Sequence, residues 1–255
     1  IIKITILTIK NLKKSILISG GNGKLATEIK KVADCFNVLS PSKNAMDITC
    51  LENVEKYINK FKPTYFIHAG AYTKPMHKHQ INPDISIKTN IIGTCNVVLG
   101  CLNSNTKLIY ISTDYVYPGL KGNYREEDAL LPFSRINDGI SKYGWSKLGG
   151  ECAVRFLNNY LIIRACLCDY PFPHNVAFSD VKKSYIYSKD AAKIIIKLLD
   201  QNGVINLGGE SKTVYEFASM NNKNIKKVKH KEVTNLDIAP DTSINLEKLN
   251  QIINQ

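Results

Sequence analysis

The sequence predicts an α/β protein in which helices cover both faces of a central parallel sheet. From Ser15 onward, short runs rich in Ile, Val and Tyr alternate with longer amphipathic segments, which is the order of a doubly wound fold. A glycine-rich turn joins the first run to the first amphipathic segment. The length of 255 residues, with 44% hydrophobic and 22% charged residues, suits one substantial domain and excludes a disordered chain or a large multidomain assembly.

The expected strands are short apolar runs, because strands buried on both faces of a parallel sheet carry few polar residues. They lie at Ile16–Ser19, Asn37–Leu39, Tyr65–Ala69, Lys107–Ser112, Tyr160–Arg164 and Val204–Leu207. The segments between them have the length and apolar spacing of helices. These lie at Lys24–Asp34, Leu51–Lys60, Pro83–Asn103, Ser141–Asn158, Ser188–Asp200 and Thr213–Met220.

This order divides the chain into three regions. Residues 1–14 are an unassigned lead-in or an extra strand, residues 15–165 form the predicted sheet domain, and residues 166–255 complete the fold and form a small lobe. Within the lobe, residues 170–187 contain Pro171 and Pro173 and break the alternation, so we expect a loop over a site there. The opening stretch, IIKITILTIK, is too short and too charged to span a membrane and lacks a signal-peptide cleavage site, so a cytoplasmic protein is expected.

The net charge of +12 suggests a nucleic-acid partner, but the composition favours a simpler explanation. Thirty of the 34 basic residues are lysines, and arginine, the better reader of phosphates and bases, is scarce. We therefore expect solvated surface lysines, also in the basic run at 221–231, and no nucleic-acid partner. The seven cysteines form no CxxC pair and are expected to be reduced and buried, with no metal site.

The first candidate site is the turn Gly20-Gly21-Asn22-Gly23-Lys24-Leu25-Ala26, which runs from the first strand into the first helix. Glycines at such a turn let backbone amides approach a pyrophosphate held at the positive end of the helix. In this strand–turn–helix context the turn predicts a dinucleotide site and hence a Rossmann fold.

The second strand ends without the acidic residue that usually accepts a hydrogen bond from the 2′-hydroxyl of an adenine ribose. The stretch reads Leu39-Ser40-Pro41-Ser42-Lys43 instead. Ser40, Ser42 and Lys43 offer a hydroxyl-rich, basic place for a 2′-phosphate, so we expect NADP(H) in preference to NAD(H).

A second constellation suggests proton transfer to a carbonyl oxygen. Tyr143 and Lys147 are four residues apart in a predicted helix, so they share one face, and the ammonium is expected to lower the pKa of the phenol. Upstream, the end of a strand delivers Thr113, Asp114 and Tyr115, and the Thr113 hydroxyl is placed to polarise a substrate carbonyl.

These residues resemble the extended short-chain dehydrogenase/reductase group, and within it the dTDP-4-dehydrorhamnose reductase family. The resemblance runs from about Ile16 to Leu249. Its most specific strings are FIHAGAYT at 66–73, ISTDYVYPG at 111–119, YGWSKLGGE at 143–151 and NLGGESKTVYEFA at 206–218. The resemblance implies that Asp47 and Ile48 flank the adenine. It also implies that Ala69, Gly70, Ala71 and Tyr72 line the ribose and pyrophosphate, Asn90 supports the nicotinamide, and Asp114, Tyr115 and Arg164 join Thr113 in binding substrate.

The family resemblance implies NADPH-dependent reduction of the 4-keto group of a nucleotide-linked 6-deoxysugar. Related 4,6-dehydratases place a Glu directly after the Thr-Asp pair, where this chain has Tyr115, so dehydration is disfavoured. Two alternatives stay open: a non-catalytic regulatory subunit similar to the methionine adenosyltransferase accessory subunit, and a nucleotide-sugar epimerase. A nucleotide sugar is the expected partner, a homodimer is possible, and no membrane association is expected.

The chain departs from the family pattern on the substrate side. The segment at 165–169, Ala-Cys-Leu-Cys-Asp, stands where many relatives have Thr-x-Trp-x-Tyr, and Asn245 stands in place of an Asp near the C-terminus. Among the histidines, we expect His68 to be packed near the cofactor, and His77 and His79 to be solvated in a lysine-rich loop. Trp145 is expected to pack beside Tyr143.

Overall fold

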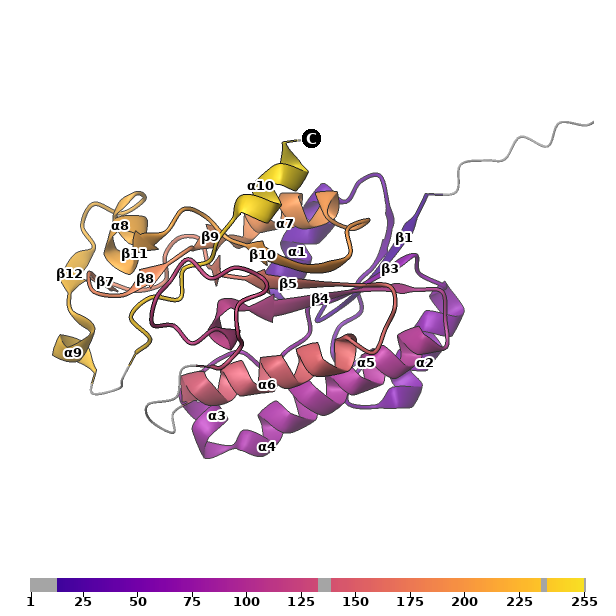
Figure 1. Ribbon diagram of the computed structural model, residues 1–255. Coiled ribbons are helices and arrows are strands. Elements are labelled where there is room, and N and C mark those ends of the chain that lie inside the picture. Colours follow the sequence, from indigo (N-terminus) through magenta and orange to yellow (C-terminus); the bar gives the residue numbers. More distant parts are fainter. Residues whose placement is uncertain (1–12, 133–138, 235–237, 255) are drawn as a thin grey trace, which may run out of the picture.

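The computed structural model describes residues 13–132, 139–234 and 238–254, so residues 1–12 of the predicted lead-in at 1–14 lie outside these ranges. The core is a parallel sheet of six strands in the order β10-β5-β4-β3-β1-β2 (Figure 1). Its strands are β1 (Ser15–Ser19), β2 (Asn37–Leu39), β3 (Tyr65–His68), β4 (Lys107–Thr113), β5 (Tyr160–Ala165) and β10 (Gly203–Leu207). The predicted strands and the doubly wound α/β class are confirmed, with ends shifted by a residue.

Helices follow the strands as the apolar spacing predicted. The main ones are α1 (Lys24–Val32), α2 (Leu51–Phe61), α5 (Gly93–Leu102), α6 (Gly139–Val154), α7 (Ser188–Lys197) and α8 (Val214–Ser219). The segment predicted as one helix from Pro83 is divided into α4 (Pro83–Ser86), a π-helical turn (Ile87–Ile92) and α5. The structure adds three short helices that the sequence did not predict: α3 (His77–Ile81), α9 (His230–Val233) and α10 (Glu247–Ile253).

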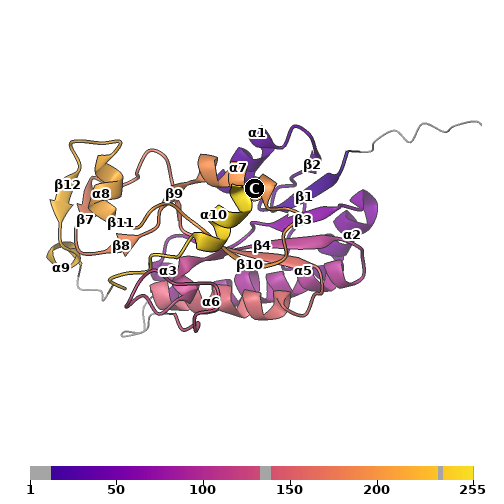
Figure 2. The same ribbon diagram turned by 45° about the horizontal axis from the view of Figure 1, so that its top comes forward.

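Alternation along the strands separates two cores. Ile16 and Ile18 pack with residues of α1, α7 and α10, whereas Leu17 packs with residues of α2, α5 and α6. Figure 2 shows these two groups of helices on opposite faces of the sheet. All three side chains are fully buried. Because each strand carries apolar residues on both faces, the sheet is covered by helices on both sides.

The order of the strands fixes the place of the site. The chain moves from β1 outward to β2 and then returns to β3 on the other side of β1. Ligands of open α/β sheets bind at the carboxyl ends of the strands where the order reverses, which here is the crevice between β1 and β3. The glycine turn follows β1 directly, and Thr113 ends the neighbouring β4.

The C-terminal third both completes the sheet and builds a lobe. β10 pairs with β5, and α7 packs beside α1, whereas the lobe lies beyond the carboxyl ends of the strands (Figure 1). Its elements include β7 (Val176–Phe178), β8 (Lys182–Lys183), β11 (Lys212–Thr213), β12 (Lys226–Val228) and α8. The basic run at 221–231 forms β12 and α9 and exposes its lysines, as expected. Residues 170–187 hold β7 and β8, so the predicted loop over a site contains short strands.

Some packing differs from expectation. Trp145 is 44% exposed rather than packed beside Tyr143, because it lies on the outer face of α6. All seven cysteines are free thiols. The expectation of burial is wrong for Cys35 and Cys152, which are exposed, and is confirmed only in part for the other five.

Candidate active site

The glycine turn brings backbone into close contact with backbone. Gly20 has a φ of +71°, and a Cβ on Gly21 would lie 2.4 Å from the carbonyl oxygens of Ser40 and Pro41. Gly21 donates a hydrogen bond to Pro41 and Gly23 donates one to Gly20. Among the described residues no side chain caps the N-terminus of α1 and its first turn has no acid, so its amides are available to an anion.

A cavity of about 790 Å³ opens at the carboxyl ends of β1, β3, β4 and β5 and continues under the C-terminal lobe. Its size is typical of a pocket for a substantial organic ligand. Twelve predicted site residues line it: Gly20, Gly23, Lys24, Leu25, Ala26, Ala69, Ala71, Thr113, Asp114, Tyr115, Tyr143 and Lys147. The glycine turn, the end of β4 and the Tyr143 helix therefore meet in one space.

Other predicted residues lie outside the cavity wall. Ser40 donates a hydrogen bond to the Gly21 carbonyl, and Lys43 is exposed on the same loop. Asp47 caps its own turn by accepting from Thr49, and Ile48 packs against Gly93. These side chains border the adenine end of the predicted site but do not line the cavity.

Gly70, Tyr72 and Asn90 shape the site from behind. Gly70 lies against Gly20, and Asn90 holds the backbone of Tyr72 by accepting from its amide at 2.7 Å and donating to its carbonyl at 2.9 Å. The Asn90 amide also donates to Ser146 on α6 at 2.9 Å. Asn90 thus joins the π-helical turn to the β3 loop and α6, which is a positioning contact.

Arg164 is a correction to the sequence prediction. Its side chain is fully buried and forms a two-pronged ion pair with Glu151, with Nη2 2.8 Å from Oε2 and Nε 3.0 Å from Oε1. Nη1 donates to the Tyr117 hydroxyl and to the Glu126 carbonyl, each at 2.9 Å. Because all of these donors are engaged inside the fold, Arg164 supports α6 and does not line the cavity.

Tyr143 lies on the cavity wall, where its surroundings keep it protonated. Burial, then the charge of Asp114 and the neighbouring Tyr115, raises the pKa of Tyr143 above its usual value, and a hydrogen bond with Thr113 works in the opposite direction. The sequence analysis expected Lys147 to lower the pKa of Tyr143, but burial and the neighbouring acidic groups raise this pKa instead. A phenol with a raised pKa is a proton donor at neutral pH.

Lys147 is buried one turn along α6. Its ammonium lies 4.0 Å from the centre of the Tyr110 ring. Burial lowers its pKa to about 7, with Glu151 acting in the opposite direction. His68 is buried, as expected, and its ring lies between the hydroxyls of Ser19 and Thr94. Burial lowers the pKa of His68 to about 3.

Asp114 joins three distant parts of the chain. Its carboxylate accepts from Thr113 at 3.1 Å, from Lys183 on β8 at 2.8 Å and from Thr242 near the C-terminus at 2.6 Å. Burial alone would lower the pKa of Lys183, but Asp114 raises it well above its usual value. Lys183 also lies 3.8 Å from the centre of the Tyr115 ring. The sequence analysis missed Lys183 and Thr242, because neither carries a motif and only the fold brings them to Asp114.

A second acid links the two walls of the cavity near its mouth. Asp169, after β6 (Leu167–Cys168), lies 2.8 Å from Lys24 of the glycine turn and 3.2 Å from Lys74 after β3. All three residues line the cavity. Desolvation opposes ionisation of Asp169, but hydrogen bonds from Lys24 and Lys74 lower its pKa.

His79 corrects another expectation. It lies buried on α3 between the rings of Tyr72 and Tyr143, with ring centres at 4.8 and 5.2 Å, and its Nδ1 is 2.7 Å from the Ser86 hydroxyl. Burial lowers its pKa. A helix that the lysine-rich sequence did not predict turns this side chain inward, whereas His77 is exposed as expected.

A family described as RmlD substrate binding domain matches residues 14–168. A dTDP-4-dehydrorhamnose reductase from Aggregatibacter actinomycetemcomitans is 30% identical over 140 residues, which cover 53% of this chain and 45% of that protein. The subunit beta of methionine adenosyltransferase 2 from Rattus norvegicus is 29% identical over 150 residues, covering 55% of this chain and 42% of that protein. The chain thus spans about half the length of these curated relatives.

Among solved structures, the similarity extends over nearly the whole chain. A dTDP-4-dehydrorhamnose reductase from Bacillus anthracis, solved in complex with NADP, superposes with a TM-score of 0.83 at 25% identity. The match covers 94% of this chain and 92% of that one.

Proposed function

The chain belongs to the RmlD substrate binding domain family, and from this membership we propose that it reduces the 4-keto group of a nucleotide-linked 6-deoxysugar with NADPH. The observation that carries the proposal is the meeting of Thr113, Tyr143 and Lys147 with the glycine turn in one cavity. In this proposal residues 15–165 hold the cofactor and residues 166–255 complete the fold and cover the sugar.

The residues present fit a dinucleotide. Gly21 leaves no room for a Cβ between the turn and the β2 loop, and the N-terminus of α1 offers amides without a competing acid. Gly20, Gly23 and Lys24 would hold the pyrophosphate, and Ala69 and Ala71 would border the ribose. The nicotinamide cofactor would supply the hydride.

The preference for NADP(H) rests on the loop after β2. No carboxylate stands at its start, and the loop carries Ser40, Ser42 and the exposed Lys43 instead. A phosphate on the ribose would meet hydroxyls and an ammonium there, without repulsion from an acid. The relative from Bacillus anthracis was solved with NADP, which agrees with this preference.

The chain's own groups support proton transfer to the substrate oxygen. Tyr143 is the donor, because its raised pKa keeps the phenol protonated until negative charge develops on that oxygen. Thr113 turns its hydroxyl from Asp114 to donate to the same oxygen. The ammonium of Lys147 stabilises the phenolate that remains, and the pairing of Asp114 with Lys183 limits the repulsion between that phenolate and the carboxylate.

The test is turnover with a defined substrate. Purified protein given NADPH and a dTDP-linked 4-keto-6-deoxysugar should oxidise the cofactor stoichiometrically with sugar reduction. Tyr143→Phe should lower kcat by about 10²- to 10⁴-fold, because it removes the proton donor and little volume. Tyr57→Phe, outside the cavity, is the matched control and should leave kcat unchanged.

A regulatory subunit is the second candidate, because the Rattus norvegicus relative is by name the subunit beta of methionine adenosyltransferase 2 and is 29% identical over 150 residues. Cofactor binding with no turnover of 4-keto sugars given as either dTDP or UDP derivatives would favour this candidate. Turnover without net cofactor oxidation would favour an epimerase. The presence of Thr113, Tyr143 and Lys147 together supports the reductase.

We also propose a homodimer in the cytoplasm. Several large apolar side chains on and next to α5 and α6 are exposed, among them Ile92, Leu99, Trp145 and Phe156, with Phe156 81% exposed. Pro83–Leu102 is long and apolar enough to cross a membrane, but its inner side packs on the sheet and 44% of it is buried. A second copy covering these exposed side chains would remove them from water. Sedimentation equilibrium should give twice the chain mass, and Leu99→Lys should shift it to the monomer.

A further inference from the structure

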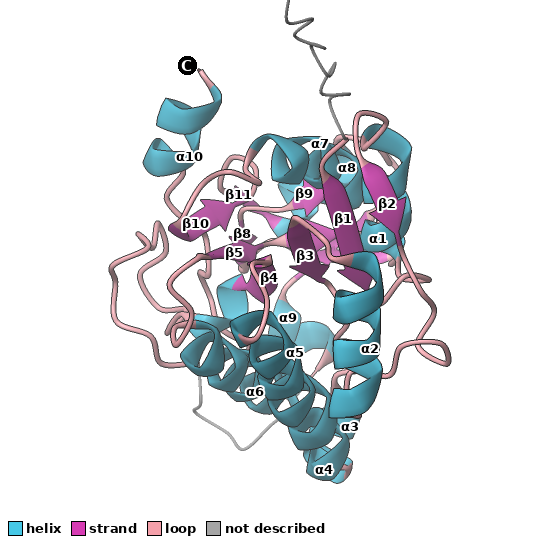
Figure 3. Cartoon of the chain, turned by 90° about the vertical axis from the view of Figure 1, so that its right-hand side faces the viewer, coloured by secondary structure: helices cyan, strands magenta, loops and turns pink. Residues whose placement is uncertain are grey.

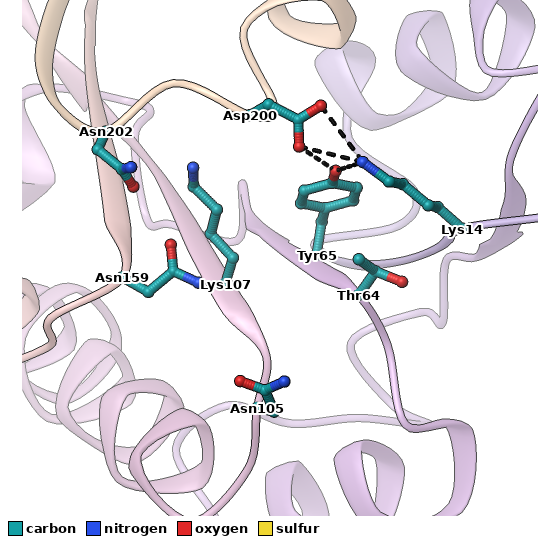
Figure 4. Close-up of a pocket in the computed structure, with 8 residues that line it drawn as sticks. All are labelled: Lys14, Thr64, Tyr65, Asn105, Lys107, Asn159, Asp200 and Asn202. Atoms are coloured by element: carbon teal, nitrogen blue, oxygen red, sulfur yellow. Dashed lines mark hydrogen bonds and ion pairs between the residues drawn. The ribbon is translucent and has the colours of Figure 1, made fainter.

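A second pocket lies at the opposite edge of the sheet, where β3 and β4 begin and where the chain enters β5. Its volume is about 330 Å³, at the small end of the range for ligand sites. The amino ends of the strands face the viewer in Figure 3, and Figure 4 shows the pocket itself. Its polar lining comprises Lys14, Lys107, Asp200, Asn105, Asn159 and Asn202, together with Thr64 and Tyr65.

Lys107 is the unusual member of this lining. The residue is 6% exposed, yet its ammonium has no hydrogen-bond or ion-pair partner among the described residues. In Figure 4 the ammonium points into the space between Asn202 and the Asp200–Tyr65 pair. A lysine with so little exposed area is normally paired. Here the ammonium reaches the space of the pocket, and the charge of Asp200 acts on it from beyond ion-pair distance.

The one acid of the lining is already engaged. Asp200 accepts from the Tyr65 hydroxyl at 2.5 Å and from Lys14 at 3.2 Å, and Lys14 also donates to the Tyr65 hydroxyl at 2.7 Å. This arrangement occupies the Asp200 carboxylate at the side of the pocket, so Asp200 attracts Lys107 through space but forms no ion pair with it. Lys14 and Lys107 with Asp200 give the lining a net charge of +1.

The rim adds neutral donors. Asn105, Asn159 and Asn202 are exposed and come from three different loops, and their side-chain amides make no hydrogen bond within the described residues. Each amide nitrogen carries two donors, and an ammonium carries three. The pocket thus offers an ammonium and amide donors from three loops around one space, and a phosphoryl group accepts hydrogen bonds from several directions.

We propose that the pocket at Lys107 binds a phosphoryl group, from free phosphate or from a small phosphorylated metabolite. Lys107 supplies the charge from the floor, and Asn202, which its ammonium approaches in Figure 4, holds an oxygen from the rim. The site is separate from the catalytic cavity, because Lys107 begins β4 and Thr113 ends it. This inference goes beyond the proposed reductase function and does not depend on it.

Chemical labelling of Lys107 tests the site without an assay of turnover. Burial lowers the pKa of Lys107, which favours the reactive free amine at mildly alkaline pH. Trace acetylation by acetic anhydride, mapped by mass spectrometry, should be slowed several-fold at Lys107 by millimolar inorganic phosphate at constant ionic strength. Labelling of the exposed Lys60 in the same sample should not change.

The outcomes separate the possible ligands. Saturable protection supports the site, and the lower half-protecting concentration, of inorganic phosphate or of glycerol 3-phosphate, identifies the source of the phosphoryl group. Absence of protection by either compound, or stronger protection by succinate, would overturn the proposal.

Variants at the rim provide a second measurement that leaves the buried lysine in place. Asn202→Ala should raise the half-protecting phosphate concentration by about twofold to tenfold, the loss expected for one hydrogen bond. Asn103→Ala, an exposed position two residues from Asn105 and outside the lining, is the matched control. Equal protection in the Asn202 and Asn103 variants would show that the rim amides hold no ligand.

Discussion

The two walls of the catalytic cavity are held in place by different interactions. On the cofactor wall, backbone packs against backbone, with Gly20 against Gly70 and Gly21 against the carbonyls of the β2 loop. On the substrate wall, side-chain charges join segments far apart in the chain, since Asp114 meets Lys183 and Thr242 across 69 and 128 residues. The first wall tolerates almost no added atom, whereas the second depends on balanced charge.

The largest effect is expected from adding one methyl group to the cofactor wall. Gly21→Ala would place a Cβ 2.4 Å from two backbone oxygens, so the turn must move. Misplacement of reacting groups by about 1 Å commonly lowers an enzyme's rate about 10²-fold. We expect a displaced turn to raise the NADPH dissociation constant by a similar factor of about 10². Isothermal titration calorimetry measures this directly.

Gly23→Ala is a milder version of the same change, because its Cβ would meet only the Gly20 carbonyl, at 3.0 Å. A smaller loss of NADPH affinity is expected there, with thermal unfolding followed for both variants. If Gly21→Ala binds NADPH as tightly as the unaltered protein, the close backbone approach is not what forms the cofactor wall.

The substrate wall should break when its charge balance is lost. Lys183→Met leaves the Asp114 carboxylate buried without its cation, which typically costs about 3–5 kcal/mol of unfolding free energy. Because Asp114 lies beside Thr113 and Tyr143, kcat/KM for the sugar should fall by about 10²-fold. NADPH affinity should change little. Urea unfolding and steady-state kinetics give the two measurements.

Two further variants keep this prediction specific. Lys182→Met changes the exposed neighbour on the same strand and should be neutral. Adding Asp114→Asn to Lys183→Met removes the stranded charge and should recover much of the unfolding free energy. A Lys183 variant as stable as the Lys182 variant would mean that the ion pair does not hold this wall.

The same contrast explains what the sequence predicted. The glycine turn, Thr113, Tyr143 and Lys147 are local motifs tied to strand and helix ends, and all of them line the cavity. Arg164 also has a motif-like position, but its role depends on Glu151, which the fold brings to it. Lys183, Thr242 and Asp169 carry no local signal, because their partners are set by tertiary packing.

Lys147 lies on α6 between the two walls, and its titration predicts a pH dependence of kcat/KM. Its pKa of about 7 lies below the usual value, so the ammonium that supports Tyr143 is lost as pH rises through 7. We expect kcat/KM to fall by about tenfold per pH unit above that point. Lys147→Arg retains its charge and should move the falling limb to higher pH. A flat profile up to pH 9 would show that the charge of Lys147 is not required.

The smallest expected effect is at the mouth, where a side-chain ion pair joins the two walls. Asp169 holds Lys24 and Lys74, but both lysines are largely exposed, and exposed ion pairs contribute about 0–1 kcal/mol. Asp169→Asn removes a negative charge from a cavity that is to receive phosphates and frees both ammonium groups for them. The KM for NADPH should therefore decrease by about twofold to fivefold at low salt, with a smaller decrease at high salt.

Asp190→Asn is the matched control for this change. Asp190 is likewise paired with a lysine, Lys193, but it lies on α7 outside the cavity lining, so its loss alters net charge equally without freeing Lys24 or Lys74. If both variants lower the KM for NADPH to the same extent, the effect is one of overall charge. If Asp169→Asn instead raises the KM, the acid holds the glycine turn in its binding conformation. Charge balance would then matter on the cofactor wall as well, and the contrast between the two walls would be weaker than the geometry indicates.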